Sequence, residues 1–83
     1  MAANEAQRED ISYDEHGHVH ERKHFRGKVL DGEYTSYFAN GQIMAHLHFQ
    51  NGLKEGEAVS YYRDGQVRER GTFKNDRLDG EYS

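Results

Sequence analysis

The sequence predicts an all-β protein, an antiparallel β-meander of about three 24-residue hairpin repeats in a single twisted and elongated sheet. The first observation behind this prediction is the period, because residues of one kind recur at a constant offset of 24 along the chain. The matching sets are Tyr13, Tyr37 and Tyr61; Gly17, Gly41 and Gly65; Val19, Ile43 and Val67; Phe25, Phe49 and Phe73; and Gly32, Gly56 and Gly80. A fixed period of this length is typical of units that bury their hydrophobic faces only by stacking on neighbours.

The second observation is a turn signal in the middle of each period. Asn40-Gly41 lies between two runs of alternating apolar and polar residues, which predicts a two-residue type I′ hairpin turn. Counting outward, one side of the sheet then pairs Phe38 with Ile43, Ser36 with Ala45, Tyr34 with Leu47 and Gly32 with Phe49. The other side pairs Tyr37 with Met44, Thr35 with His46 and Glu33 with His48. We therefore expect one largely apolar side and one mixed side.

The outer units repeat this plan with changes. His16-Gly17 and Asp64-Gly65 stand at the turns, and charged residues interrupt the apolar side. The predicted strands are 11–14, 18–25, 33–38, 42–49, 57–62, 66–73 and 80–82, with longer turns at 26–32, 50–56 and 74–80. The last three-residue strand is half a unit, and we expect it to pair with the strand before it.

The composition bounds the chain to one small domain. We expect a folded β-repeat domain at residues 11–83, preceded by an acidic, flexible extension at residues 1–10. Hydrophobic residues make up 34% and charged residues 31%, so the regular placement of apolar residues, more than their amount, argues for folding. The acidic terminus either keeps the protein soluble or acts as a docking arm.

Several function classes are disfavoured. The chain has no cysteine, no nucleophile–base set and no phosphate-binding glycine loop, so we expect neither an enzyme, catalytic residues nor a cofactor. Residues 16–83 carry balanced charge, which argues against nucleic acid and also against anionic membranes. No apolar run is long enough for a membrane helix and no signal peptide is present, so the sequence predicts a cytoplasmic protein.

The pattern G-E-Y-x-S-Y-F-x-N-G-Q, an eight-residue strand ending in Phe, and N-G-L-K-x-G resemble the MORN repeat. The resemblance is to the variant form in small bacterial proteins that are often labelled as antitoxins, and it covers residues 11–83. It implies a meander of hairpins in one elongated sheet, and functions that range over lipid association, scaffolding, appendage to enzymes and toxin neutralisation. The chain departs from the pattern at Gly27-Lys28 and Asn75-Asp76, where the middle unit has Asn51-Gly52.

Histidines form the first candidate cluster. The members are His16, His18, His20 and His24 in the first unit, with His46 and His48 in the second. Imidazole suits zinc, copper and nickel, but no partner residue fixes a geometry, and neighbouring repeats lie about 9.6 Å apart. We therefore predict no metal site and interpret these histidines as polar strand positions.

The two sides of the sheet are the remaining candidates. Register counting also pairs Tyr13 with His20 and Tyr61 with Arg68, and the predicted partner-binding residues on that side are Tyr37, Tyr61, Arg68, Arg70, His46 and Arg22. The alternative is that tyrosine suits strands and arginine keeps a sheet soluble. The predicted self-association residues on the other side are Tyr34, Phe38, Ile43, Leu47 and Phe49. We expect this apolar side to be closed by a second copy in a homodimer, or to be reserved for the target protein.

These features predict a small protein-binding repeat module that acts by stoichiometric protein–protein interaction. The expected mode is inhibition, of the antitoxin, immunity or comparable defence-inhibitor type. The alternative is a MORN-like scaffold or membrane-associating element without inhibitory activity.

Overall fold

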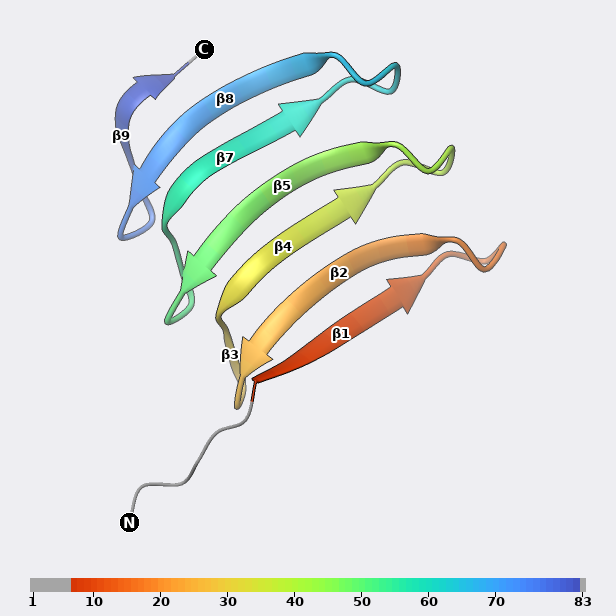
Figure 1. The fold of residues 1–83 in the computed structure, drawn as a ribbon, viewed down its shortest axis with the longest axis horizontal. Helices are drawn as coiled ribbons and strands as arrows, with labels where there is room; N and C mark the ends of the chain where they lie inside the picture. The colour runs from red at the N-terminus through yellow and green to blue at the C-terminus, as the bar shows by residue number, and fades with distance from the viewer. Residues whose placement is uncertain (1–6, 83) are drawn as a thin grey trace.

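The computed structural model describes residues 7–82, which form one nine-stranded antiparallel sheet (Figure 1). The strands are β1 (Gln7–Tyr13), β2 (Val19–Arg26), β3 (Val29–Leu30), β4 (Gly32–Tyr37), β5 (Ile43–Gln50), β6 (Leu53–Lys54), β7 (Gly56–Tyr61), β8 (Val67–Lys74) and β9 (Arg77–Tyr82). Their order across the sheet is β1-β2-β4-β5-β7-β8-β9, while the short strands β3 and β6 pair with β2 and β5. The predicted all-β meander is confirmed.

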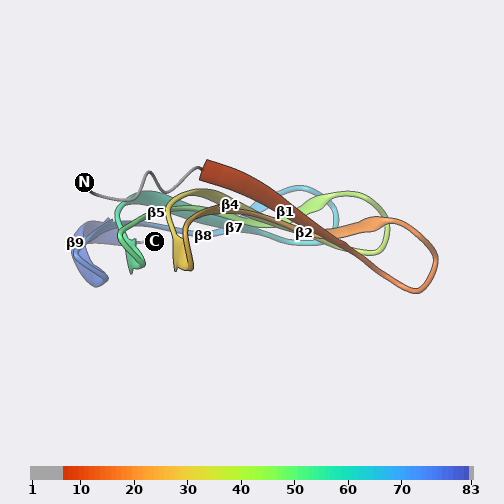
Figure 2. The same ribbon diagram turned by 90° about the horizontal axis from the view of Figure 1, so that it is seen from below.

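The sheet is a single layer. The principal extents are 49 × 37 × 11 Å, and the edge-on view shows no second layer over either face of the described strands (Figure 2). Within the described part of the chain no hydrophobic side chain is buried, and the buried polar side chains are Thr35 and Ser36. Strand pairing and half-buried contacts on the two faces therefore hold this fold together.

The predicted register is correct in the body of the second hairpin, β4–β5. Gly32 pairs with Phe49, and the pairing continues without a break to Ser36 and Ala45. Between Ser36 and Tyr37 the register shifts by one residue, so Tyr37 pairs with Ile43. The predicted pairs of Tyr37 with Met44 and of Phe38 with Ile43 are therefore wrong.

The same shift occurs in the first hairpin, β1–β2, and in the third, β7–β8. Tyr13 pairs with Val19, and Tyr61 pairs with Val67. The predicted partners of these tyrosines were His20 and Arg68, which are displaced by one position. A one-residue slip moves a side chain to the opposite face, so the shift changes both surfaces near the turns.

The cause of the shift is a longer loop than predicted. Phe38 N–H donates to Gln42 O at 2.8 Å and Gly41 N–H donates to Phe38 O at 2.9 Å, which closes a three-residue loop over residues 39–41. A type I′ turn needs positive φ at both central residues, but Gly41 has a φ of 91° and Asn40 is not in that region. Three-residue loops end on a residue in the left-handed region and carry a bulge, so the type I′ prediction at Asn40-Gly41 is wrong.

The two-residue hairpins lie at the opposite end of the strands. Gln50 pairs with Leu53, and the intervening Asn51 and Gly52 have φ values of 54° and 82°, as a type I′ turn requires. The longer turns predicted at 26–32, 50–56 and 74–80 are therefore wrong, because each contains a tight hairpin whose second strand returns for at least two residues. These turns also join the repeats, since Gly52 N–H donates to Leu30 O at 2.8 Å.

The first strand is longer than predicted. Gln7 pairs with Arg26 and Asp10 with Lys23, so residues 7–10 belong to an edge strand, although the sequence assigned them to the flexible extension. Backbone pairing with β2 compensates for their polar character, and Arg8 lies 4.7 Å from the centre of the Phe25 ring. Residues 1–6 of that predicted extension lie outside the described residues. At the other end, β9 pairs with β8 as expected.

Candidate interaction surfaces

The alternation of side chains along the strands gives the sheet two different faces. We call one the arginine face, after the row that crosses the three hairpins: Ile11, Arg22, Thr35, His46, Val59 and Arg70. We call the other the phenylalanine face, after Phe25, Phe49 and Phe73. Residues paired in antiparallel strands share a side, so these rows follow directly from the register.

On the arginine face, Arg22 connects the first two hairpins. Its Nη1 donates to Glu9 Oε2 at 3.0 Å within the first hairpin, and Tyr37 of the second hairpin lines the same hollow as Arg22. The contact with the Glu9 carboxylate is the largest cause that raises the pKa of Arg22 above its ordinary value. Arg22 is thus a fixed cation beside an aromatic ring.

The row continues through the other hairpins with different partners. His46 Nδ1 lies 2.9 Å from Thr35 Oγ1, and Arg70 Nε lies 3.5 Å from Glu57 Oε2. The position of Arg22 and Arg70 is therefore occupied by a histidine in the middle hairpin, where it contacts a hydroxyl group in place of a carboxylate. The backbone pairing along this row is therefore the same in each hairpin, whereas the side chain at the arginine position differs.

An open hollow of about 320 Å³ lies at the turn end of this face. It is lined by His18, Val19, Arg22, Tyr37, Ala39, Asn40 and Gly41. The lining includes a cation, a phenol and the backbone of a turn, which are groups that hydrogen-bond to peptides. The register shift in the first hairpin helps to form this hollow, because it brings Val19 beside Tyr37.

The phenylalanine face is apolar in the second hairpin. Tyr34 and Phe49 form an edge-on ring pair with centroids 6.0 Å apart. The Tyr34 hydroxyl donates to Glu21 Oε2 at 2.5 Å. This bond is the largest cause of the lowered pKa of Glu21, while burial, followed by the same bond, raises the pKa of Tyr34 to about 12.

Cations cover the outer rings of the phenylalanine face. Arg8 and Lys23 lie 4.7 and 6.0 Å from the centre of the Phe25 ring, and Lys54 lies 5.0 Å from that of Phe73. Cation–π contacts at such distances stabilise exposed rings by about 0.5–1 kcal/mol. Phe49, in the middle, has an aromatic neighbour in Tyr34.

A second open hollow, of about 170 Å³, lies over the third hairpin. Its lining residues are Ala45, Leu47, Ala58, Val59, Ser60, Glu69, Arg70, Gly71 and Phe73. The hollow has a simple origin, because Ala58 and Gly71 occupy the positions that Tyr34 and Leu47 fill one repeat earlier. This difference of side-chain size is the signal in the sequence that indicates the hollow.

The register shift near the turns redistributes two of the predicted site residues, Arg68 and Ile43. Arg68 was expected to pair with Tyr61, but Tyr61 pairs with Val67. The Arg68 Nη1 donates to Glu69 Oε1 at 3.4 Å, and Arg68 lines a hollow with Phe38, Met44 and Tyr61. Ile43 was expected on the apolar side, but it pairs with Tyr37 on the arginine face. The sequence signal for this exchange was the choice between a two- and a three-residue loop.

The other predicted residues keep their places. Phe38 lies at the turn with the Arg63 guanidinium 5.7 Å from its ring centre. Tyr34, Leu47 and Phe49 lie together on the phenylalanine face. The members that the structure places on the arginine face are Tyr37, Tyr61, Arg22, His46 and Arg70.

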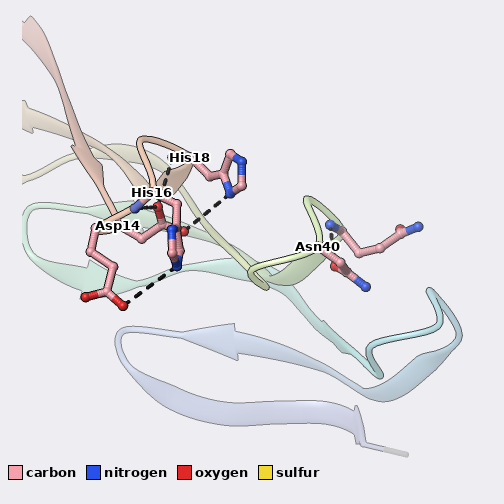
Figure 3. A network of polar contacts seen from close by, with 6 residues as sticks. Asp14, His16, His18 and Asn40 are labelled. Atoms are coloured by element: carbon pink, nitrogen blue, oxygen red, sulfur yellow. Dashed lines mark hydrogen bonds and ion pairs between the residues drawn. The ribbon is translucent and has the colours of Figure 1, made fainter.

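The first turn combines acidic residues and histidines (Figure 3). Asp14 Oδ1 accepts N–H groups of His16 and His18 at 2.8 and 2.9 Å, and the bond from His18 is the largest cause of the lowered Asp14 pKa. The carboxylate thus closes the turn, a role that Asn40 has in the second hairpin by accepting Gln42 N–H. Among the side chains that the structure describes, no three histidine or acidic residues are placed to hold a metal ion.

The fold and the two faces define a repeat protein that presents broad, shallow surfaces. The chain belongs to the MORN repeat variant family, which matches residues 30–51 and 54–75, more than half of its length. MORN repeats are in general protein- or membrane-binding repeat modules. No curated protein and no solved structure matches the chain. The described residues contain no helix with the length and hydrophobicity needed to cross a membrane.

Proposed function

We propose that this protein is a protein-binding module that acts by stoichiometric occupation of a partner protein, as an inhibitor of the antitoxin, immunity or comparable type. The observation that carries the proposal is the arginine face, where Arg22, His46 and Arg70 lie beside a row of tyrosines across three hairpins. Arginine and tyrosine are the residues that most often dominate the binding energy of protein interfaces.

The proposed contact surface centres on Tyr37, Tyr61, Arg22, His46 and Arg70. Arg22 is held by Glu9 and lies beside Tyr37, so little side-chain entropy is lost when a partner docks against it. The hollow beside it accepts a side chain of the partner. The face also carries Glu9 and Glu57 next to its cations, which favours a protein of mixed charge over an anionic membrane.

The test compares two arginines of β8: Arg70, which lies in the row of the arginine face, and Arg68, which the register shift leaves without a cross-strand pair on β7. The wild-type chain and the variants Tyr61→Ala/Arg70→Ala and Arg68→Ala are immobilised, and proteins retained from the source cell are identified. The partner is expected to bind the wild type and Arg68→Ala, and to lose at least about tenfold in affinity for the double variant.

A purified partner is then titrated with the chain, and loss of the partner's activity is expected to saturate at a fixed molar ratio. Equal binding of the double variant would rule out the arginine face. Sedimentation with anionic vesicles in the absence of any protein partner would instead support a membrane-associating element.

A further inference from the structure

We propose that the phenylalanine face is closed by a second copy of this chain in a two-fold symmetric, face-to-face dimer, with the second hairpin of each copy seated on the third hairpin of the other. The proposal rests on a match of size between the two hairpins within one chain. It is independent of the partner that the arginine face binds.

The four central strands are β4, β5, β7 and β8. Large residues on some of these strands lie at the same height along the strand direction as small residues on others. Their register places three rows on the phenylalanine face, each running across all four strands. The rows are Ser36, Ala45, Ser60 and Glu69; Tyr34, Leu47, Ala58 and Gly71; and Gly32, Phe49, Gly56 and Phe73. The large residues are concentrated on β5, and the small ones on β7.

We place the two-fold axis parallel to the strands, between β5 and β7. Rotation about this axis reverses the order of the strands in the second copy, but each residue keeps its height along the strand direction. β5 of one copy then faces β7 of the other, and β4 faces β8. Leu47 lies opposite Ala58, Phe49 opposite Gly56, and Tyr34 opposite Gly71. In the two apolar rows a large residue therefore meets a small one, which is the condition for two sheets to interdigitate at about 10 Å.

The hollow over the third hairpin provides the receiving surface. Its volume is about 170 Å³, and a cavity of about 150 Å³ admits an aromatic ring. In the dimer Tyr34 and Leu47 of the second copy lie over this hollow, while the same contact is repeated across the axis. An isologous interface of this kind is complete with two copies, so it does not propagate into a fibre.

The contact area is sufficient for a stable dimer. The axis brings β2, β4, β5, β7, β8 and β9 into the facing region; at about 4.8 Å per strand and about 20–25 Å of length, this gives roughly 600–700 Å² for each copy. Standard interfaces bury about 800 Å² per partner, with weaker ones below about 600 Å². β1 alone overhangs the interface, and it is the strand whose first four residues are exposed and polar.

The dimer also explains why the single sheet has no hydrophobic core among the described residues. No hydrophobic side chain of the described residues is buried, although half-buried rings and aliphatic groups gather on one face. Lys23 and Lys54 border these groups as a polar rim. Both arginine faces remain outside the dimer, so the assembly offers two copies of the proposed partner-binding surface.

The test fills the hollow with larger side chains. Ala58→Tyr/Gly71→Leu gives the third hairpin the two side chains of the second, and sedimentation equilibrium at micromolar concentration measures the mass. The wild type is expected to be a dimer, and the double variant to dissociate about a hundredfold more readily because large residues then face large ones. Thr72→Leu adds a leucine to the same strand on the arginine face and leaves the dimer unchanged.

Two further variants keep the test decisive if the first one misfolds. Leu47→Lys introduces the residue that the first hairpin has at this position, Lys23, and is expected to give a folded monomer. Tyr34→Ala/Leu47→Gly makes the second hairpin small and weakens its own dimer, but mixing it with Ala58→Tyr/Gly71→Leu restores a dimer of one copy each. A wild-type monomer at all concentrations, or a dimer that Leu47→Lys leaves intact, overturns the proposal.

Discussion

The second and third hairpins have the same backbone and different surfaces. In both, a glycine that begins the first strand pairs with a phenylalanine of the second strand, and the register shifts at the same place, after Ser36 and after Ser60. Both turns close with the same pair of backbone hydrogen bonds, on Phe38 and on Tyr62. The conformation is thus reproduced to the level of individual bonds.

The side chains on the two faces differ much more. Tyr34 and Leu47 become Ala58 and Gly71 on the phenylalanine face, and His46 becomes Arg70 on the arginine face. The comparison teaches that a few glycines and turn residues specify the hairpin, because they provide φ values and acceptors that other residues do not. The remaining positions are free to vary in size and charge and to create binding surfaces.

The largest expected effect comes from breaking the shared turn. Gly41→Val or Gly65→Val places a β-branched residue at φ values of 91° or 96°, which is expected to destabilise the fold by about 2–3 kcal/mol. A Cβ at Gly41 meets no atom within 4 Å, so the cost arises from the backbone and not from a clash. Urea unfolding followed by circular dichroism measures it, with Gly41→Asn as the milder control. A loss below about 0.5 kcal/mol for Gly41→Val would contradict this role.

A smaller effect is expected from a bond that the second hairpin has and the third lacks. Tyr34→Phe removes the hydroxyl that donates to Glu21, at an expected cost of about 1–2 kcal/mol, because hydrogen bonds to charged groups are the stronger ones. Ala58 occupies the same position in the third hairpin and has no such group. Tyr62→Phe removes an exposed hydroxyl and is the matched control, with little change expected.

The bond between Tyr34 and Glu21 is identified by how the stability lost in Tyr34→Phe depends on pH. Because the pKa of Glu21 is lowered, its contribution to the free energy of unfolding is present above the ordinary pKa of 4.5. This contribution is lost as the pH falls through the lower pKa of the folded state. The pKa of Tyr34 is raised from 10.0 to about 12, so its contribution is present below pH 10 and is lost as the pH rises toward 12. The difference in unfolding free energy between wild type and Tyr34→Phe should therefore be largest between these limits. A constant difference down to pH 3 would exclude the bond to Glu21.

The smallest effect separates the two glycines that begin these hairpins. Gly32 and Gly56 both have positive φ, but a Cβ at Gly32 would lie 3.0 Å from His24 Cβ, whereas one at Gly56 meets no atom within 4 Å. Gly32→Ala is expected to cost about 1 kcal/mol more than Gly56→Ala, because His24 Cβ lies next to the backbone and moves little. Thermal unfolding of the two variants measures the difference. Equal costs would mean that the contact at Gly32 relaxes freely.

By itself the sequence determined the fold class, the number of repeats and the register in the body of each hairpin. The reason is that the 24-residue period and the alternation of polar and apolar residues leave one pairing that keeps Tyr34, Leu47 and Phe49 on one side. It also placed Arg22, His46 and Arg70 in one row. The composition of the row that we propose to bind a partner was therefore largely predictable from the residues alone.

Only the tertiary structure decided the length of the turns and therefore the side on which Ile43 and Arg68 lie. Asn-Gly suits both a two- and a three-residue loop, and local sequence does not choose between them. The longer loop at Asn40 is accompanied by contacts with the next repeat, since Asn40 Nδ2 donates to Arg63 O at 3.2 Å and Arg63 lies over Phe38. These contacts join residues 23 and 25 positions apart, so they exist only once the hairpins lie side by side.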